Sequence, residues 1–211
     1  PASLLSAGVE GPLFALAALG LFALARKLSW KELAGGVHLN LLLGFAVCLT
    51  LIWSMKAGVK PGLNLHLLGA MAATLALGPW KAVAALALAL CGITLNGALE
   101  WGDWPANFVL MVLVPVAVAS GLHRLVERLL PAHFFIFIFV TGFAGSALTV
   151  MAQGLTASTV LALSGAYSAG FLWSDYLPFF LLLGFSEGWI SGAIITLMVV
   201  YRPEWVRSEE H

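Results

Sequence analysis

The sequence has little charge. Only 9% of its 211 residues are Asp, Glu, Lys or Arg, whereas 61% are hydrophobic. Soluble domains carry about 25% charged and about 45–50% apolar residues, so this composition cannot supply a water-facing surface. The ten basic residues balance the ten acidic ones, and this zero net charge excludes the basic surface with which proteins bind nucleic acid. The composition therefore indicates a chain surrounded by a lipid bilayer.

Cysteine and catalytic motifs are also scarce. Cys48 and Cys91 both lie in apolar runs, where a buried, inert thiol is expected rather than a disulfide or a metal-binding pair. The sequence has no phosphate-binding loop, CxxC pair, nucleophile elbow or paired His at the spacing for haem. We therefore expect neither an enzyme nor an intrinsic cofactor. No cleavable signal peptide is evident. Because the sequence starts at Pro1 instead of Met, we expect that upstream residues either have been lost or lie outside this numbering.

Seven apolar runs predict membrane-spanning helices, because about 20 largely apolar residues cross a hydrocarbon core of about 30 Å. These runs cover residues 12–25, 39–55, 63–77, 82–99, 108–122, 134–151 and 177–200. A further apolar stretch, 156–171, is rich in Ser, Gly and Thr, and we interpret it as a loop with a partial or re-entrant helix. The sequence thus predicts an all-α, polytopic transmembrane bundle of about seven helices, in a single transmembrane domain over residues 1–211.

The positive charges predict the orientation of the bundle, because cytoplasmic loops hold the excess of Lys and Arg. With the N-terminus outside and seven crossings, only Lys56 and Lys60 lie outside, together with the acidic Glu100, Asp103 and Asp175. The basic residues inside are Arg26, Lys27, Lys31, Lys81, Arg124, Arg128, Arg202 and Arg207. An eighth crossing over 156–171 would move the last two outside, so we prefer seven crossings and a cytoplasmic C-terminus.

Glu187 lies near the middle of the last predicted helix. A charged side chain at the bilayer centre costs roughly 2.5–3.5 kcal/mol on insertion scales, so we expect it to face the interior of the bundle. Gly184, Gly188 and Gly192 recur at four-residue spacing beside Ser191, a pattern typical of closely packed membrane helices. Glu187 is then either a ligand, proton site or gate, or a structural hydrogen-bond partner of a neighbouring helix.

His66 lies near the outer end of the third predicted helix, shortly after Asn64. On that helix, His66, Gly69 and Ala73 would share one stripe, because positions three and four apart lie on the same face. Imidazole is a good ligand for transition metals, which makes His66 a candidate metal ligand. A single His does not by itself identify a metal site.

Other polar and aromatic residues lie close to predicted helix ends. Asn96 and Asn107 flank the acidic outer loop, where they either cap helix ends or line a site. Six tryptophans near helix ends are interpreted as interfacial anchors. They are Trp30, Trp53, Trp80, Trp101, Trp104 and Trp205.

Two motifs resemble those of a known family. The first is Asn-Leu-His-Leu-Leu-Gly at 64–69, followed by Leu-Gly-Pro-Trp at 77–80. The second is Ser-Glu-Gly at 186–188, with Tyr-Arg-Pro-Glu at 201–204. Together they resemble the CbiM/NikM family, the membrane components that capture substrate for energy-coupling factor ABC transporters of cobalt and nickel. The similarity is closest to a proteobacterial CbiM-like branch.

The resemblance implies a seven-helix protein with an outward N-terminus that captures a divalent transition metal from the outer side. In the family, the N-terminal amine, a His at the second position and a His on the third helix bind the metal. The last of these corresponds to His66, with Asn64 and Glu187 as supporting candidates. The chain departs from the family at its start, which reads Pro-Ala-Ser instead of Met-His-Ile, and at Leu110, where the family has a second Asn.

We therefore predict a multi-pass protein of the cell inner membrane that captures a cobalt-like or nickel-like ion for transport. Because the chain has no ATPase motif, transport would require a coupling transmembrane subunit and ATPase subunits. Arg202 and its neighbours at 201–204 either contact such a partner or act as positive-inside anchors. The alternative is a non-transporting binding or accessory subunit that keeps the fold but binds an organic cofactor, a lipid or a partner protein instead of metal.

Overall fold

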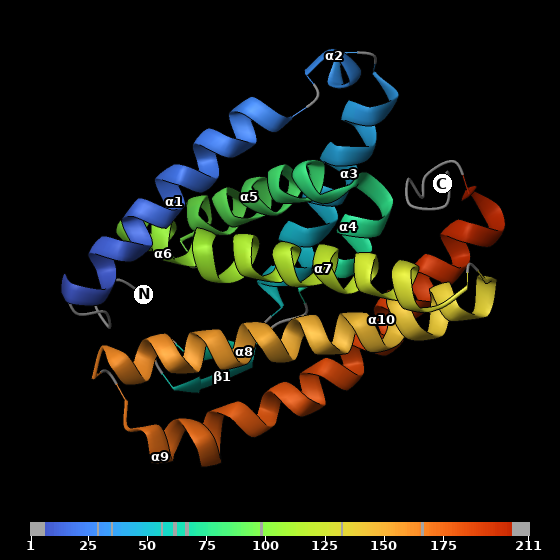
Figure 1. The fold of residues 1–211 in the computed structure, drawn as a ribbon. Helices are drawn as coiled ribbons and strands as arrows, with labels where there is room; N and C mark the ends of the chain where they lie inside the picture. Colours follow the sequence, from blue (N-terminus) through green and yellow to red (C-terminus); the bar gives the residue numbers. More distant parts are fainter. Residues whose placement is uncertain are drawn as a thin grey trace.

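The protein is a bundle of helices packed side by side (Figure 1). The computed structural model describes residues 7–28, 30–34, 36–55, 57–60, 63–65, 68–97, 99–131, 133–165 and 167–203. Within these ranges, seven helical segments have at least eight residues. Four are single helices: α1 (Ala7–Lys27), α3 (Val37–Ser54), α4 (Ala70–Leu77) and α5 (Pro79–Leu95).

The other three segments join α-helix to π-helix. The first runs through α6 (Trp104–Phe108), η3 (Val109–Leu113) and α7 (Val114–Leu129), after the short η2 (Trp101–Asp103). The second joins η4 (Ile136–Ala144) to α8 (Gly145–Leu163), and the third joins α9 (Ala169–Phe171), η5 (Leu172–Tyr176) and α10 (Leu177–Tyr201). One turn of helix, α2 (Trp30–Leu33), and a hairpin of β1 (Ala57–Lys60) and β2 (Leu63–Leu65) complete the described elements.

Five helical stretches of the described chain are long and apolar enough to cross a membrane. They are Gly8–Lys27, Val37–Ser54, Trp101–Leu129, Ile136–Leu163 and Ala169–Tyr201. Pro79–Leu95 is also apolar but shorter. The predicted polytopic transmembrane helix bundle is confirmed, and the small hairpin is an addition to it.

Proline accounts for two of the three π-helical segments in the described chain. Pro115 follows η3 and Pro178 follows η5. Proline has no N–H, so the carbonyl four residues earlier lacks its helical donor. In both cases that carbonyl, of Met111 or Ser174, lies inside the π segment. The wider turn is therefore the local response to a missing hydrogen bond.

The predicted third helix, over 63–77, is helical only from Ala70 to Leu77. Its first part is strand β2, which pairs antiparallel with β1. Gly69 is the N-cap residue, immediately before the first residue of α4, and has φ +74°. This left-handed conformation favours glycine. The prediction of one helical stripe through His66, Gly69 and Ala73 is therefore wrong, because Gly69 precedes the helix. His66 lies outside the described residues.

The stretch 156–171 is the junction between two long helices. Helix α8 continues to Leu163, Gly165 turns the chain with φ +71°, and α9 begins at Ala169. The interpretation of the whole stretch as a loop with a partial or re-entrant helix is wrong for residues 156–163, which continue α8. Thr156 does not interrupt the helix there, because its hydroxyl bonds the carbonyl one turn earlier, that of Ala152. The turn is confined to the residues around Gly165, between α8 and α9.

The η4–α8 segment and α10 pack closely along the predicted glycine face. A methyl group added at Gly184 would lie 3.2 Å from the carbonyl oxygen of Ala147, and one at Gly188 would lie 3.0 Å from that of Phe143. The predicted packing role is confirmed at Gly184 and Gly188, since a larger residue would press on the backbone of the neighbouring segment. At Gly192, a methyl group would lie 3.7 Å from Cβ of Phe143, an ordinary contact distance.

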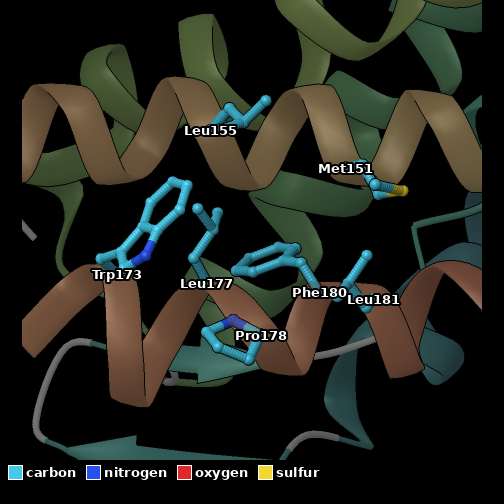
Figure 2. Close-up of a pocket in the computed structure, with 7 residues that line it drawn as sticks. All are labelled: Met151, Leu155, Trp173, Leu177, Pro178, Phe180 and Leu181. Carbon is cyan, nitrogen blue, oxygen red and sulfur yellow. The ribbon is translucent and has the colours of Figure 1, made fainter.

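A cavity of about 320 Å³ opens beside this packed interface, between α8 and the η5–α10 segment. Figure 2 shows its lining side chains, which are apolar. They are Met151, Leu155, Trp173, Leu177, Pro178, Phe180 and Leu181. The lining has no carboxylate or imidazole, which are the common ligands of divalent transition metals. The cavity is therefore not a candidate metal site.

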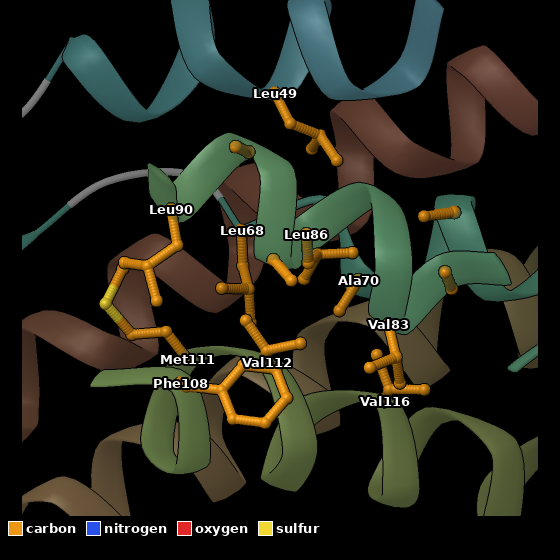
Figure 3. Close-up of a cluster of buried hydrophobic side chains, with 14 of the residues drawn as sticks. Leu49, Leu68, Ala70, Val83, Leu86, Leu90, Phe108, Met111, Val112 and Val116 are labelled. Atoms are coloured by element: carbon orange, nitrogen blue, oxygen red, sulfur yellow. The ribbon is translucent and has the colours of Figure 1, made fainter. Parts of the chain in front are cut away.

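The main core lies between α3, α4, α5 and the α6–η3–α7 segment. All eight residues of α4 are buried, so this short helix lies at the centre of the bundle. Figure 3 shows Leu68, just before α4, among buried side chains that include Leu86, Phe108 and Val112. The chain entering α4 is thus fixed by packing as well as by the hydrogen bonds described next.

Candidate functional site

Glu187 is buried near the centre of α10, with 2% of its surface exposed. Its carboxylate oxygens accept hydrogen bonds from two successive backbone N–H groups. The N–H of Leu68 donates to Oε2 at 2.8 Å, and that of Gly69 donates to Oε1 at 2.5 Å. The hydroxyl of Ser191, one turn further along α10, is also a hydrogen-bond partner. Three hydrogen-bond partners thus compensate for the loss of hydration of the buried carboxylate.

The start of α4 is a favourable place for this carboxylate. Gly69 is the N-cap residue of α4, and the first N–H groups of a helix have no partner within it. Those groups carry partial positive charge, and successive N–H groups in a turn form a concave anion site. The two donors belong to the N-cap Gly69 and to Leu68 before it, so the carboxylate of α10 lies at the positive end of α4 and binds the chain just before this helix.

Leu68 is held from a third helix as well. The indole Nε1–H of Trp53, at the end of α3, donates to the carbonyl oxygen of Leu68 at 2.9 Å. Trp53 is only 1% exposed, so its interpretation as an interfacial anchor is wrong. Both backbone polar groups of Leu68 are therefore engaged, one by α10 and one by α3.

These bonds connect the sequence candidates along the chain. Asn64 belongs to β2, where its backbone pairs with Gly58, and Leu68 follows His66 by two positions. Glu187 therefore contacts the backbone of the same short segment that carries His66 and Asn64. The side chain of Asn64 and all of His66 lie outside the described residues, so their role as metal ligands stays a prediction.

Comparison with known proteins gives the family. The family described as "Cobalt uptake substrate-specific transmembrane region", CbiM, matches residues 1–205. The chain belongs to the CbiM family. Among curated proteins, none matches its sequence significantly.

Two solved structures share the fold of this CbiM-family chain. A truncated transition metal transporter matches with a TM-score of 0.77 and 19% identity, over 95% of this chain and 98% of its own. A second transition metal transporter matches with a TM-score of 0.76 and 19% identity, over 94% of this chain and 91% of its own. At this identity the likeness shows a common fold.

Clusters of metal-binding side chains are absent from the part of the CbiM-family chain that the structure describes. No group of three or more His, Cys, Asp or Glu residues in those ranges could hold a metal ion, and His66 is not among the residues searched. Cys48 and Cys91 are free thiols, but Cys48 is exposed on α3 and Cys91 is half-buried, so the expectation that both are buried is wrong. The assignment of His66 as a metal ligand is not tested by this search and stays a prediction.

The two outer asparagines have different positions. Asn96 is the C-cap residue of α5 and is exposed, as expected for a residue at a helix end. Asn107 lies within α6, and its Nδ2 is buried without a hydrogen-bond partner in the described ranges. Asn107 therefore does not cap a helix, and its alternative role, lining a site, stays a prediction.

Sequence reasoning missed the contribution of Trp53 and of the Leu68 backbone. The Trp53 indole and the Leu68 peptide group come together because the β1–β2 hairpin returns the chain toward α3. A pattern of apolar runs does not predict such a hairpin. A usable signal was Gly69 at the start of a short Ala-rich run, because glycine often marks a helix boundary.

Proposed function

We propose that this multi-pass membrane protein captures a divalent transition-metal ion, cobalt or nickel, from the outer side of the cell inner membrane for uptake. The observation that carries the proposal is the binding of Leu68 and Gly69, which follow His66 in the sequence, by the buried Glu187 carboxylate in a chain of the CbiM family. The ion is the cargo of the protein and not its resident cofactor.

In this proposal, His66 is the ligand that binds the ion directly, because neutral imidazole suits cobalt and nickel. Asn64 and Glu187 are supporting residues of this metal site. The role of Glu187 is indirect, since each of its carboxylate oxygens already accepts a backbone hydrogen bond. A carboxylate so engaged is better suited to hold a ligand-bearing segment than to bind the ion.

The charge distribution supports the orientation of this single transmembrane domain, with the N-terminus outside. In Figure 1, α5 begins, and α7 and α10 end, toward the same side of the bundle. Basic residues gather at these helix ends, including Lys81, Arg128 and Arg202, as expected for the cytoplasmic side. A coupling transmembrane subunit and ATPase subunits would then act from that side as an energy-coupling factor, with Arg202 as a candidate contact.

Metal binding by the purified protein tests the proposal. Wild type, His66→Ala and His38→Ala would be loaded with Co²⁺ or Ni²⁺ in detergent, desalted and assayed for retained metal. His38 is a suitable control because it is exposed, on α3. We expect wild type and His38→Ala to retain the ion and His66→Ala to lose it. Metal-free wild type, or equal metal in all three proteins, would contradict the proposal and favour a non-transporting binding subunit.

A further inference from the structure

We propose that Glu187 is a positioning residue for metal capture, which acts through the backbone of Leu68 and Gly69. Its carboxylate would fix the position of the segment that carries His66. The affinity for the metal ion would then depend on the hydrogen bonds between Glu187 and this segment. This inference rests on the proposed function and adds to it a role for the buried acidic residue of α10.

The geometry requires a carboxylate at this position. The two donors are adjacent backbone N–H groups, and each meets its own carboxylate oxygen, at 2.8 Å and 2.5 Å. A glutamine would offer one carbonyl oxygen and one NH₂ group. Its NH₂ would then face a backbone N–H, so one of the two bonds would be lost and replaced by two opposed donors.

The rest of the segment cannot easily compensate for that loss. Leu68 is 2% exposed and its carbonyl oxygen is bound to Trp53. Gly69 has φ +74°, and a methyl group added there would lie 2.5 Å from Cδ2 of Leu49. With α3 on one side and α10 on the other, a lost bond to Glu187 leaves a buried N–H without water to replace the acceptor.

The consequence for His66 follows from its place in the chain. Only one residue separates His66 from Leu68, and metal affinity depends steeply on groups that orient a ligand. Loss of such an outer group typically lowers metal affinity by about 10–100-fold. We expect a change of that size on replacement of Glu187, although Glu187 itself does not bind the ion.

The test compares Glu187→Gln with two controls. Glu127→Gln is the matched substitution at a half-exposed residue of α7 paired with His123. Ile195→Ala removes a fully buried side chain from α10 and so destabilises the helix without touching the carboxylate. Each protein would be measured for Co²⁺ affinity, for the visible absorption spectrum of bound Co²⁺, and for hydrogen–deuterium exchange in peptides that cover 63–75.

We expect Glu187→Gln to exchange faster than wild type in these peptides without metal, to bind Co²⁺ about 10–100-fold more weakly and to show an altered Co²⁺ spectrum. Both controls should keep the wild-type spectrum, even where Ile195→Ala lowers thermal stability. Unchanged exchange, or faster exchange with wild-type affinity and spectrum, would overturn the positioning role. Wild type that binds no Co²⁺ would instead overturn the proposed function, and the two failures are thereby told apart.

Discussion

Trp53 and Leu68 are joined by a buried hydrogen bond of 2.9 Å, from the indole Nε1–H to the backbone carbonyl oxygen, across fifteen residues of chain. The bond closes the base of the β1–β2 hairpin, because Trp53 ends α3 and Leu68 precedes α4. The hairpin is therefore attached to the bundle at a defined point, which is also the point that Glu187 contacts.

Replacing this indole should destabilise the protein. Trp53→Phe keeps most of the ring but leaves the Leu68 carbonyl without its donor, which costs about 1–3 kcal/mol for a buried polar group. The measurement is the temperature at which half of the monodisperse peak in detergent is lost on heating. Trp30→Phe is the control, because its Nε1–H also bonds a carbonyl, that of Ala25, but at an exposed site. Equal thermal midpoints for Trp53→Phe and Trp30→Phe would contradict the expectation that the buried hydrogen bond contributes more to stability than the exposed one.

Gly69 should tolerate no side chain. Gly69→Ala combines a left-handed backbone, which costs about 1–2 kcal/mol for a residue with a Cβ, with a contact of 2.5 Å to Leu49. We expect both a lower thermal midpoint and weaker Co²⁺ retention. Gly97→Ala separates the two causes, because Gly97 has φ +82° but open space around it. If Gly97→Ala destabilises the protein as much as Gly69→Ala, the contact with Leu49 has no effect.

The glycines of α10 should differ in their response to alanine. At Gly188, the added methyl group would lie 3.0 Å from the carbonyl oxygen of Phe143, which belongs to a neighbouring backbone. At Gly192, the nearest atom, Cβ of Phe143, is 3.7 Å away. Alanine gains about 1 kcal/mol over glycine in a helix interior, so Gly192→Ala should raise the thermal midpoint, whereas Gly188→Ala should lower it. The same direction of change in both variants would argue against close packing at Gly188.

The sequence predicted the spanning helices well because lipid imposes a simple requirement, a long apolar run. The same simplicity explains the error over 63–77. Strand β2 and helix α4 are both apolar, so the run continues through Gly69 although the backbone changes there. The error over 156–171 has a related cause, since hydroxyl groups bonded to their own helix are tolerated at membrane depth.

The candidate site was only partly predictable. The motif around His66 was found from the sequence through its resemblance to a known family. Glu187 was found because an acidic residue in an apolar helix is costly. The bonds between Glu187 and Leu68–Gly69 join residues more than one hundred positions apart, and no local pattern contains such a contact. Trp53 was misinterpreted for the same reason, since its burial depends on the returning hairpin.

The packing of α8 against α10 limits the path of any ion. At Gly184 and Gly188, α10 approaches the η4–α8 segment so closely that even a methyl group would press on a backbone oxygen. A hydrated cation needs a continuous column of water, and this seam has no room for one. An ion bound near the hairpin therefore cannot reach the cytoplasm along this seam while the two helices stay together. Under the proposed function, the ion therefore follows a path other than this seam, or α8 and α10 separate to release it.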